Sequence, residues 1–175
     1  MKKVIETIRD PYEVQKIAFN LVKSCRAEIL GVFSTANAFH RQIRMGALEL
    51  LKEASKTKET KIRILTPVDD RIYELSQKMF RQLQGIKTRH IEPLLQTRVS
   101  ILIVDRRFSL VVELKDDTKD NSYEAMGLAT YSNSKSTVLS YATIFESLWN
   151  QNELYEQLKV HDKIQRDFIN IAAHE

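Results

Sequence analysis

The C-terminal part of the sequence, from Thr137 to Glu175, contains neither glycine nor proline. Apolar residues recur through this segment at the spacing of one helix face, so we expect a single uninterrupted helix. A helix of nearly forty residues is about 60 Å long, which exceeds an average globular helix and is typical of a coiled coil. The stretch SNSKST (132–137) supplies several oxygens for the N-cap. The sequence therefore predicts a long C-terminal helix over about 134–175.

This predicted helix divides into two parts with different apolar faces. The first part carries Tyr141, Phe145, Leu148 and Trp149, which we expect to pack back onto a sheet. In the second part, a heptad seam is formed by Leu154, Gln157, His161, Ile164, Phe168 and Ile171. A single helix would leave the apolar seam residues in water, and polar seam residues lower stability but can fix the register. We therefore expect a parallel homodimer through the C-terminal helix.

Residues 1–133 alternate between helical and extended patterns. Helices are expected at about 11–27, 37–56 and 69–85, and strands at 28–34, 61–68, 86–92, 98–104, 108–114 and 125–131. Asp10 before Pro11 is a typical helix start, and Asp105-Arg106-Arg107 is a tight hairpin connection. This order predicts an α/β fold, a mixed sheet flanked by helices, followed by the long C-terminal coiled-coil helix.

The composition is that of a globular protein in a reducing compartment. Of the 175 residues, 43% are hydrophobic and 29% are charged, and no stretch approaches the roughly eighteen apolar residues of a membrane span. The net charge of +4 invites a nucleic-acid partner, but Lys and Arg alternate with Asp and Glu, so we expect none. A single cysteine, Cys25, precludes an internal disulfide. We expect a cytoplasmic protein without a membrane span.

Motifs of the common cofactor and metal sites are missing from the sequence. It contains no GxGxxG or GxxxxGKS/T loop, no GxSxG elbow, no HExxH and no CxxC. His40 lies in the basic stretch FHRQIR and is expected at the surface, while His90 lacks partners at metal-ligand spacing. For Cys25, buried packing and a redox-sensing thiol are the two alternatives. We expect no cofactor and no metal in these residues.

One hairpin resembles a known catalytic hairpin. The stretch RVSILIVDRRFSLVV (98–112) resembles the segment that carries the HxKxxxxD motif in the phospholipase D superfamily, and the order of elements agrees. In that family the His attacks phosphorus, the Lys holds the phosphate and the Asp orients the His. Here Arg98 stands at the His position, Ser100 at the Lys position, and only Asp105 is retained. The resemblance implies a non-catalytic sensor domain; an ordinary hairpin with an Asp in its turn is the alternative.

The last eight residues, FINIAAHE (168–175), resemble the opening of the H-box of sensor histidine kinases. The preceding ELYEQLKVHDKIQRD resembles the linker helix of these kinases, particularly archaeal ones. On a helix, His174 lies about 110° from the centre of the seam, on the flank of the expected dimer. The resemblance implies that His174 is the phosphoacceptor, that Glu175 polarises its imidazole, and that the sequence ends within the H-box. A plain dimerisation helix is the alternative.

These features predict the input region of a cytosolic two-component histidine kinase, with a sensor domain over 1–133 and a signalling helix over 134–175. The resemblance implies that the parent kinase uses ATP and magnesium and phosphorylates a response regulator, while this part alone is inactive. The sequence does not identify the stimulus. The alternative is an effector-binding domain resembling those of archaeal sugar-responsive transcription regulators; a degenerate phosphodiesterase is a third possibility.

Overall fold

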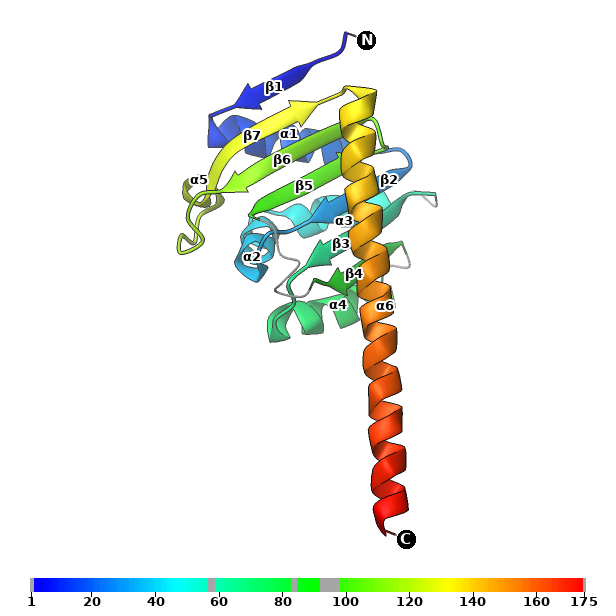
Figure 1. The fold of residues 1–175 in the computed structure, drawn as a ribbon. Coiled ribbons are helices and arrows are strands. Elements are labelled where there is room, and N and C mark those ends of the chain that lie inside the picture. Colours follow the sequence, from blue (N-terminus) through cyan, green and yellow to red (C-terminus); the bar gives the residue numbers. More distant parts are fainter. Residues whose placement is uncertain (1, 57–58, 83–84, 92–97, 175) are drawn as a thin grey trace.

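A mixed sheet with helices on both faces forms the body of the protein (Figure 1). The structure, a computed structural model, describes residues 2–56, 59–82, 85–91 and 98–174. Its strands are β1 (Ile5–Ile8), β2 (Glu28–Val32), β3 (Lys61–Thr66), β4 (Ile86–His90), β5 (Val99–Val104), β6 (Phe108–Leu114) and β7 (Met126–Ser132). Its helices are α1 (Pro11–Lys23), α2 (Ala36–Arg44), α3 (Ala47–Ser55), α4 (Asp70–Gln82), α5 (Ser122–Ala125) and α6 (Lys135–His174).

The strands lie in the order β1-β7-β6-β5-β2-β3-β4, with β1 and β4 at the edges of the sheet as described. Strands β2, β3 and β4 run parallel to one another, and every other neighbouring pair is antiparallel. The parallel strands are connected through helices and the antiparallel β5 and β6 through a tight turn, as their connection lengths require. The predicted mixed sheet flanked by helices is therefore confirmed.

The helix starts follow the local sequence, but one predicted helix is two. Asp10 caps α1 as expected, because its Oδ1 accepts a hydrogen bond from the backbone N–H of Tyr12 at 3.0 Å. The helix expected over 37–56 is divided into α2 and α3 at Gly46, whose φ of 97° lies in the left-handed region. That prediction was wrong, because glycine alone adopts this conformation without strain and the apolar spacing continues across the break.

Two elements were not predicted from the sequence. Strand β1 pairs with β7 from Ile5 opposite Ser132 to Ile8 opposite Ala129, and of its residues only Ile8 is buried. The strand therefore does not show the alternation of buried and exposed residues that is typical of a half-buried strand. Helix α5 is a single turn from Ser122 to Ala125, capped by Asn121, between the strands expected at 108–114 and 125–131.

The sheet separates two apolar cores. One lies under α1 to α4, and its buried residues include Val14, Phe39, Ile64 and Ile72. The other lies between the opposite face of the sheet and α6, and includes Leu30, Ile103, Phe145 and Trp149. Figure 1 shows α6 crossing one face while the other helices lie behind the sheet. Successive residues of a strand point to opposite faces, so each central strand contributes to both cores.

Helix α6 has a sheet-covering half and a projecting half. Val138, Ala142, Phe145 and Trp149 are buried at spacings of four and three residues, which confirms that this part packs onto the sheet. Beyond β4 the helix continues away from the body to His174 (Figure 1). The sheet-covering half is part of the same core as the strands, while the boundary at 133 and the coiled coil stay predictions. In the described part of the chain, no helix is both long and apolar enough to cross a membrane.

A charged cluster binds the middle of α6 to the sheet. The Glu146 carboxylate accepts hydrogen bonds from Arg63 of β3 at 2.5 Å and from Arg106 of the β5–β6 turn at 2.7 Å. Arg106 also donates to Glu28 at 2.8 Å. The hydrogen bond from Arg63 lowers the pKa of Glu146, and Arg106 lowers it further, against the opposing effect of partial burial. The cluster therefore keeps Glu146 ionised and α6 in register on the sheet.

A second group of contacts fixes the point where α6 leaves the sheet. The guanidinium of Arg89, on edge strand β4, lies 4.0 Å from the centre of the Trp149 ring. Its Nη1 donates to the Trp149 carbonyl at 3.1 Å, and the Asn152 side chain donates to the His90 carbonyl. A stacked and hydrogen-bonded arginine has little freedom, so these contacts set the direction of the projecting half.

We expect Phe145→Ala to lower the free energy of unfolding by about 3–5 kcal/mol, because the ring is 1% exposed and leaves a cavity under α6. The matched control is the neighbouring Ile144→Ala, since Ile144 is 47% exposed on the outer side of the helix. It should change stability by no more than about 0.5 kcal/mol. Urea unfolding followed by circular dichroism measures both. Equal losses for the two variants would contradict the packing of α6.

Candidate functional site

The turn between β5 and β6 holds Asp105, the retained residue of the HxKxxxxD pattern. Asp105 and Arg106 have φ values of 54° and 52°, as the two central residues of a type I′ turn do. The Asp105 carboxylate accepts hydrogen bonds from the backbone N–H groups of Arg26, Ala27 and Glu28 at 3.0, 2.8 and 2.9 Å. These bonds bind the hairpin to the start of β2 and hold the strained turn in place.

Asp105 does not share a site with the other two positions of the pattern. Arg98 and Ser100 lie at the beginning of β5, and Asp105 follows the end of the same strand. Asp105 follows Ser100 by five positions of extended chain, which corresponds to about 17 Å. Asp105 therefore acts on the backbone of the α1–β2 connection and not on a reacting group at position 98 or 100.

Cys25 lies against the same carboxylate, with its Sγ 3.5 Å from Asp105 Oδ1. Burial and the negative charge of Asp105 raise the pKa of the Cys25 thiol to about 11. A thiol with this pKa remains protonated at neutral pH, whereas reactive cysteines need a lowered pKa. Of the two alternatives for Cys25, the geometry favours packing over redox sensing.

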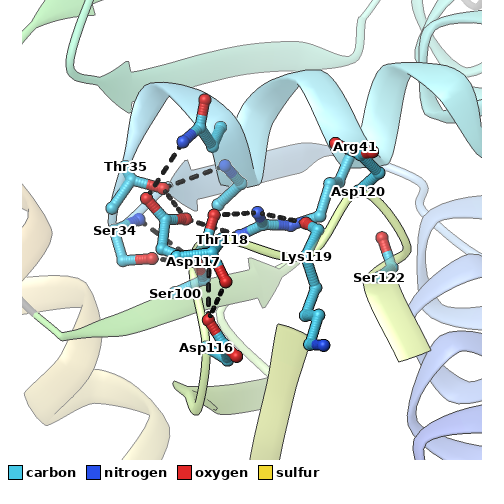
Figure 2. A network of polar contacts seen from close by, with 12 residues as sticks. Ser34, Thr35, Arg41, Ser100, Asp116, Asp117, Thr118, Lys119, Asp120 and Ser122 are labelled. Carbon is cyan, nitrogen blue, oxygen red and sulfur yellow. Dashed lines mark hydrogen bonds and ion pairs between the residues drawn. The ribbon is translucent and has the colours of Figure 1, made fainter. Parts of the chain in front are cut away.

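At the other end of β5, polar groups converge around Ser100 (Figure 2). The backbone N–H of Ser34, just beyond β2, donates to Ser100 Oγ at 3.2 Å, and the Oγ atoms of the two serines are 3.4 Å apart. Thr35 caps α2 by accepting from the Ala38 N–H at 2.9 Å, and its Oγ1 donates to Asp117 at 2.8 Å. The position of the family's Lys is thus occupied by a serine within a neutral hydrogen-bonded corner.

Arg41 holds the loop 115–121 against α2. Its side chain is 4% exposed, and its Nη2 forms an ion pair with Asp117 Oδ1 at 2.7 Å. Its Nη1 donates to the carbonyls of Asp117 and Lys119 at 3.2 and 3.1 Å, and Arg44 donates to the Asp120 carbonyl at 2.8 Å. Figure 2 shows the loop residues gathered around the Arg41 guanidinium. The buried charge is therefore compensated by one carboxylate and two carbonyl oxygens.

A cavity of about 160 Å³ lies beside this network, between α1, α2, α3 and the sheet. Its lining is almost entirely apolar and includes Val14, Phe19, Leu51, Ile64, Leu102 and Met126. Gly31, in the middle of β2, contributes to the sheet side of the lining. Ser34, Ser100 and Arg41 belong to the lining as well, so the cavity adjoins the polar corner around Ser100.

Two glutamines form a second polar group in the lining. Gln15 of α1 and Gln42 of α2 are joined by a reciprocal amide pair, in which each Nε2 is 3.0 Å from the Oε1 of the other. Gln42 also donates to Ser122 Oγ at 3.3 Å. An amide has two donor and two acceptor positions, so the pair retains hydrogen-bonding capacity on the side facing the cavity.

The predicted phosphoacceptor lies far from this cavity. His174 is exposed at the end of the projecting half of α6 (Figure 1), and Glu175 lies outside the described residues. His161 is also exposed on the projecting half. Within the described ranges, no group of three or more His, Cys, Asp or Glu residues is arranged to hold a metal ion.

The other two histidines have structural partners. His40 Nε2 lies 2.8 Å from Asp69 Oδ2, and the His40 side chain is 17% exposed, so it is less superficial than expected. Asp69 in turn caps α4 by accepting from the N–H of Ile72 at 2.9 Å. His90 Nδ1 accepts from the backbone N–H of Val68 at 2.9 Å. These contacts join α2, β4 and the start of α4.

Sequence reasoning did not single out Arg41, Asp117, Gln15 or Gln42. A signal was present in the helix spacing: Gln42 follows the buried Ala38 by four residues, and Gln15 precedes Ala18 by three. Polar side chains therefore occupy positions on the inward faces of α1 and α2. That Arg41 meets Asp117 across 76 residues could not be read from any local pattern.

Comparison with known proteins identifies the fold. The structure is similar to NucT from Helicobacter pylori, with a TM-score of 0.64 and 8% identity over 85% of this chain and 97% of that one. It is similarly close to Nuc from Salmonella typhimurium, a phospholipase D family member, with a TM-score of 0.62 and 13% identity over 86% and 96%. The chain thus has a phospholipase D-like fold, as the hairpin resemblance implied. No family model and no curated protein matches the sequence.

A third similar structure is TrmBL2, described as an archaeal chromatin protein with a novel mode of DNA binding. The TM-score is 0.61 and the identity 13%, over 84% of this chain but only 52% of that one. The likeness therefore concerns about half of TrmBL2. At such identities, all three similarities show the fold and not a shared activity.

We expect Asp105→Asn to lower the free energy of unfolding by about 1 kcal/mol at pH 7, because the amide accepts the three N–H groups less strongly and partial exposure screens the charge. Burial opposes ionisation of Asp105, but the bonds from Glu28, Ala27 and Arg26 lower its pKa. A carboxylate whose pKa is lowered by folding stabilises the folded protein at pH values above its unfolded-state pKa of about 3.9. This stabilisation is lost as the pH falls through the folded-state pKa. The difference between the two proteins in urea unfolding should therefore shrink below about pH 4.

Hydrolysis of a generic phosphodiester provides the complementary measurement. Neither the unmutated protein nor the Asp105→Asn variant should show turnover, because Arg98 and Ser100 replace the nucleophile and the phosphate-binding lysine. Turnover that disappears with the substitution, or a stability difference that persists undiminished at pH 3, would contradict the structural role of Asp105.

Proposed function

We propose that the chain is the input region of a cytosolic histidine kinase, in which a non-catalytic phospholipase D-like domain controls a dimeric signalling helix. The observation that carries this proposal is the continuity of α6, which is a core element at one end and an exposed amphipathic rod at the other. A change in how α6 packs on the sheet therefore also changes the position of its projecting half, which ends at His174. The domain is thus the input and α6 the output.

The contacts of α6 with the sheet provide the means of control. Glu146 bridges Arg63 and Arg106, and Arg89 stacks on Trp149 at the exit point. Moving the helix by one turn would break these pairings as a group, so they favour discrete positions over a gradual slide. A stimulus acts by preferring one of these arrangements, since only a difference in affinity shifts a conformational equilibrium.

Exposed apolar residues on the projecting half support dimerisation. Ile164, Phe168 and Ile171 have exposed fractions of 61%, 73% and 62%, and they follow one another at spacings of four and three. A lone helix would hold this apolar stripe in water, and pairing with the same stripe of a second copy buries it. The parallel arrangement brings two His174 side chains to the same end of the dimer.

His174 is the proposed phosphoacceptor, with Glu175 as its acidic neighbour. An exposed imidazole on the flank of a helix pair is accessible to a separate ATP-binding domain, which would supply ATP and magnesium elsewhere in the parent kinase. The phosphoryl group would then pass to a response regulator. These roles rest on the likeness of FINIAAHE to an H-box.

A second candidate is the effector-binding domain of a transcription regulator. It is favoured by the similarity to TrmBL2, whose description refers to DNA binding by that protein. In this case α6 would pair two copies and position a DNA-binding domain in place of a kinase. A charge of +4 spread among acidic residues gives this domain no strong attraction for DNA by itself.

We expect Phe168→Glu to convert a dimer into a monomer, because it places a charge within the buried stripe of each helix. The matched control is Asn170→Glu, which adds the same charge to the opposite side of the same helix turn. Analytical ultracentrifugation distinguishes the two states across a range of concentrations. A monomer in the unmutated protein, or a dimer that survives Phe168→Glu, would contradict dimerisation through α6.

The parent protein, given ATP and magnesium, should become labelled at His174 with an acid-labile, base-stable phosphoramidate. His174→Gln should remove the label and leave the dimer intact, because a flank residue contributes little to the seam. His161→Gln should keep the label and change dimer stability by about 1 kcal/mol, as polar seam residues do. A label that survives His174→Gln, or moves to His161, would refute the H-box assignment.

A further inference from the structure

We propose that the cavity between α1, α2, α3 and the sheet is a binding site for a small, uncharged, largely apolar molecule about the size of one aromatic ring. The assignment rests on the proposed input role, to which it adds the chemical class of the ligand. Its volume of about 160 Å³ is close to that of an apolar cavity known to remain dry and to bind benzene. The cavity adjoins two polar groups that can orient such a molecule.

Gly31 is the observation that distinguishes this cavity from a packing defect. It lies inside β2, an interior strand of the sheet, where a glycine weakens the strand and buries no side chain. Its φ is not in the left-handed region, and a Cβ added there would meet only Ile64 Cγ1, at 3.9 Å. Neither the backbone conformation nor a close neighbour therefore requires glycine. The missing side chain leaves open space on the sheet side of the cavity.

The polar residues of the lining define which ligands fit. The Gln15–Gln42 pair and Ser122 retain donor and acceptor capacity for one hydroxyl, amide or ring N–H group. A ligand anion would have to compete with Asp117 for Arg41, whose charge is already compensated by the ion pair at 2.7 Å. Placing an unpaired charge among apolar side chains is strongly unfavourable. Glu113 also belongs to the lining, and its carboxylate repels an anion. The site therefore excludes anions, and the apolar remainder of the lining favours a neutral molecule with one polar group.

The cavity and α6 are connected through shared strands. In β2, Gly31 lines the cavity while Leu30 packs under α6. In β5, Leu102 lines the cavity while Ile103 packs under α6. A molecule that fills the space next to Gly31 thus contacts the same strands on which α6 lies, with one layer of backbone between them.

Binding of benzene, phenol and benzoate to the full chain tests the proposal, with NMR shifts of the lining methyl groups as the readout. Phenol should bind about five to ten times more tightly than benzene, the effect of one hydrogen bond, and benzoate should not bind. Gly31→Val should fill the space, abolish binding of both neutral probes and raise the melting temperature. Thr130→Val is the control, a substitution of similar size in strand β7 at a residue outside the cavity lining. It should bind like the unmutated protein.

The double variant Gln15→Leu/Gln42→Leu tests the polar part of the site. Replacing both partners together leaves no unpaired amide, so the fold should persist. The preference of this variant for phenol over benzene should become smaller, because Ser122 is the remaining member of this polar group. Binding of benzoate as tight as that of phenol, normal binding by Gly31→Val, or no binding of any probe would overturn the proposal. None of these measurements involves dimerisation or phosphorylation, so a failure here is distinct from a failure of the proposed signalling role.

Discussion

The structure depends on the packing of Phe145 and Trp149 between α6 and the sheet. Without this contact one face of a central β-sheet would be open to water, because the other helices described here lie on the opposite face. The same contact fixes the direction in which the rest of α6 leaves the body. The stability of the domain and the direction of the projecting half thus depend on one interface, so that direction cannot change without some change in the core.

The turn at Asp105 and Arg106 connects the layers on the two sides of this sheet. Asp105 binds the backbone at the start of β2, and Arg106 binds Glu146 on α6. Both residues have positive φ, a conformation that costs energy for non-glycine residues and persists only when its surroundings hold it. A residue that belongs to a catalytic motif in the phospholipase D superfamily is here part of the structural connection between the layers.

Ser100, at the Lys position of the HxKxxxxD pattern, lies in a hydrogen-bonded corner without net charge. Ser100 bonds to Ser34, and Arg41 and Asp117 neutralise each other beside it. The cavity beside this corner is largely apolar, and the missing side chain of Gly31 leaves open space on its sheet side.

The sequence by itself determined the elements whose causes are local. The absence of glycine and proline after Thr137 specified α6, Asp10 and Pro11 specified the start of α1, and alternation specified most strands. It missed β1, which is held by pairing with β7 and not by its own pattern, and it missed the break at Gly46, since glycine also occurs inside helices. The Arg41–Asp117 pair, the glutamine pair and the cavity were decided only by tertiary structure. Each joins segments far apart in the chain, and their contacts depend on how helices settle on the sheet rather than on any local preference.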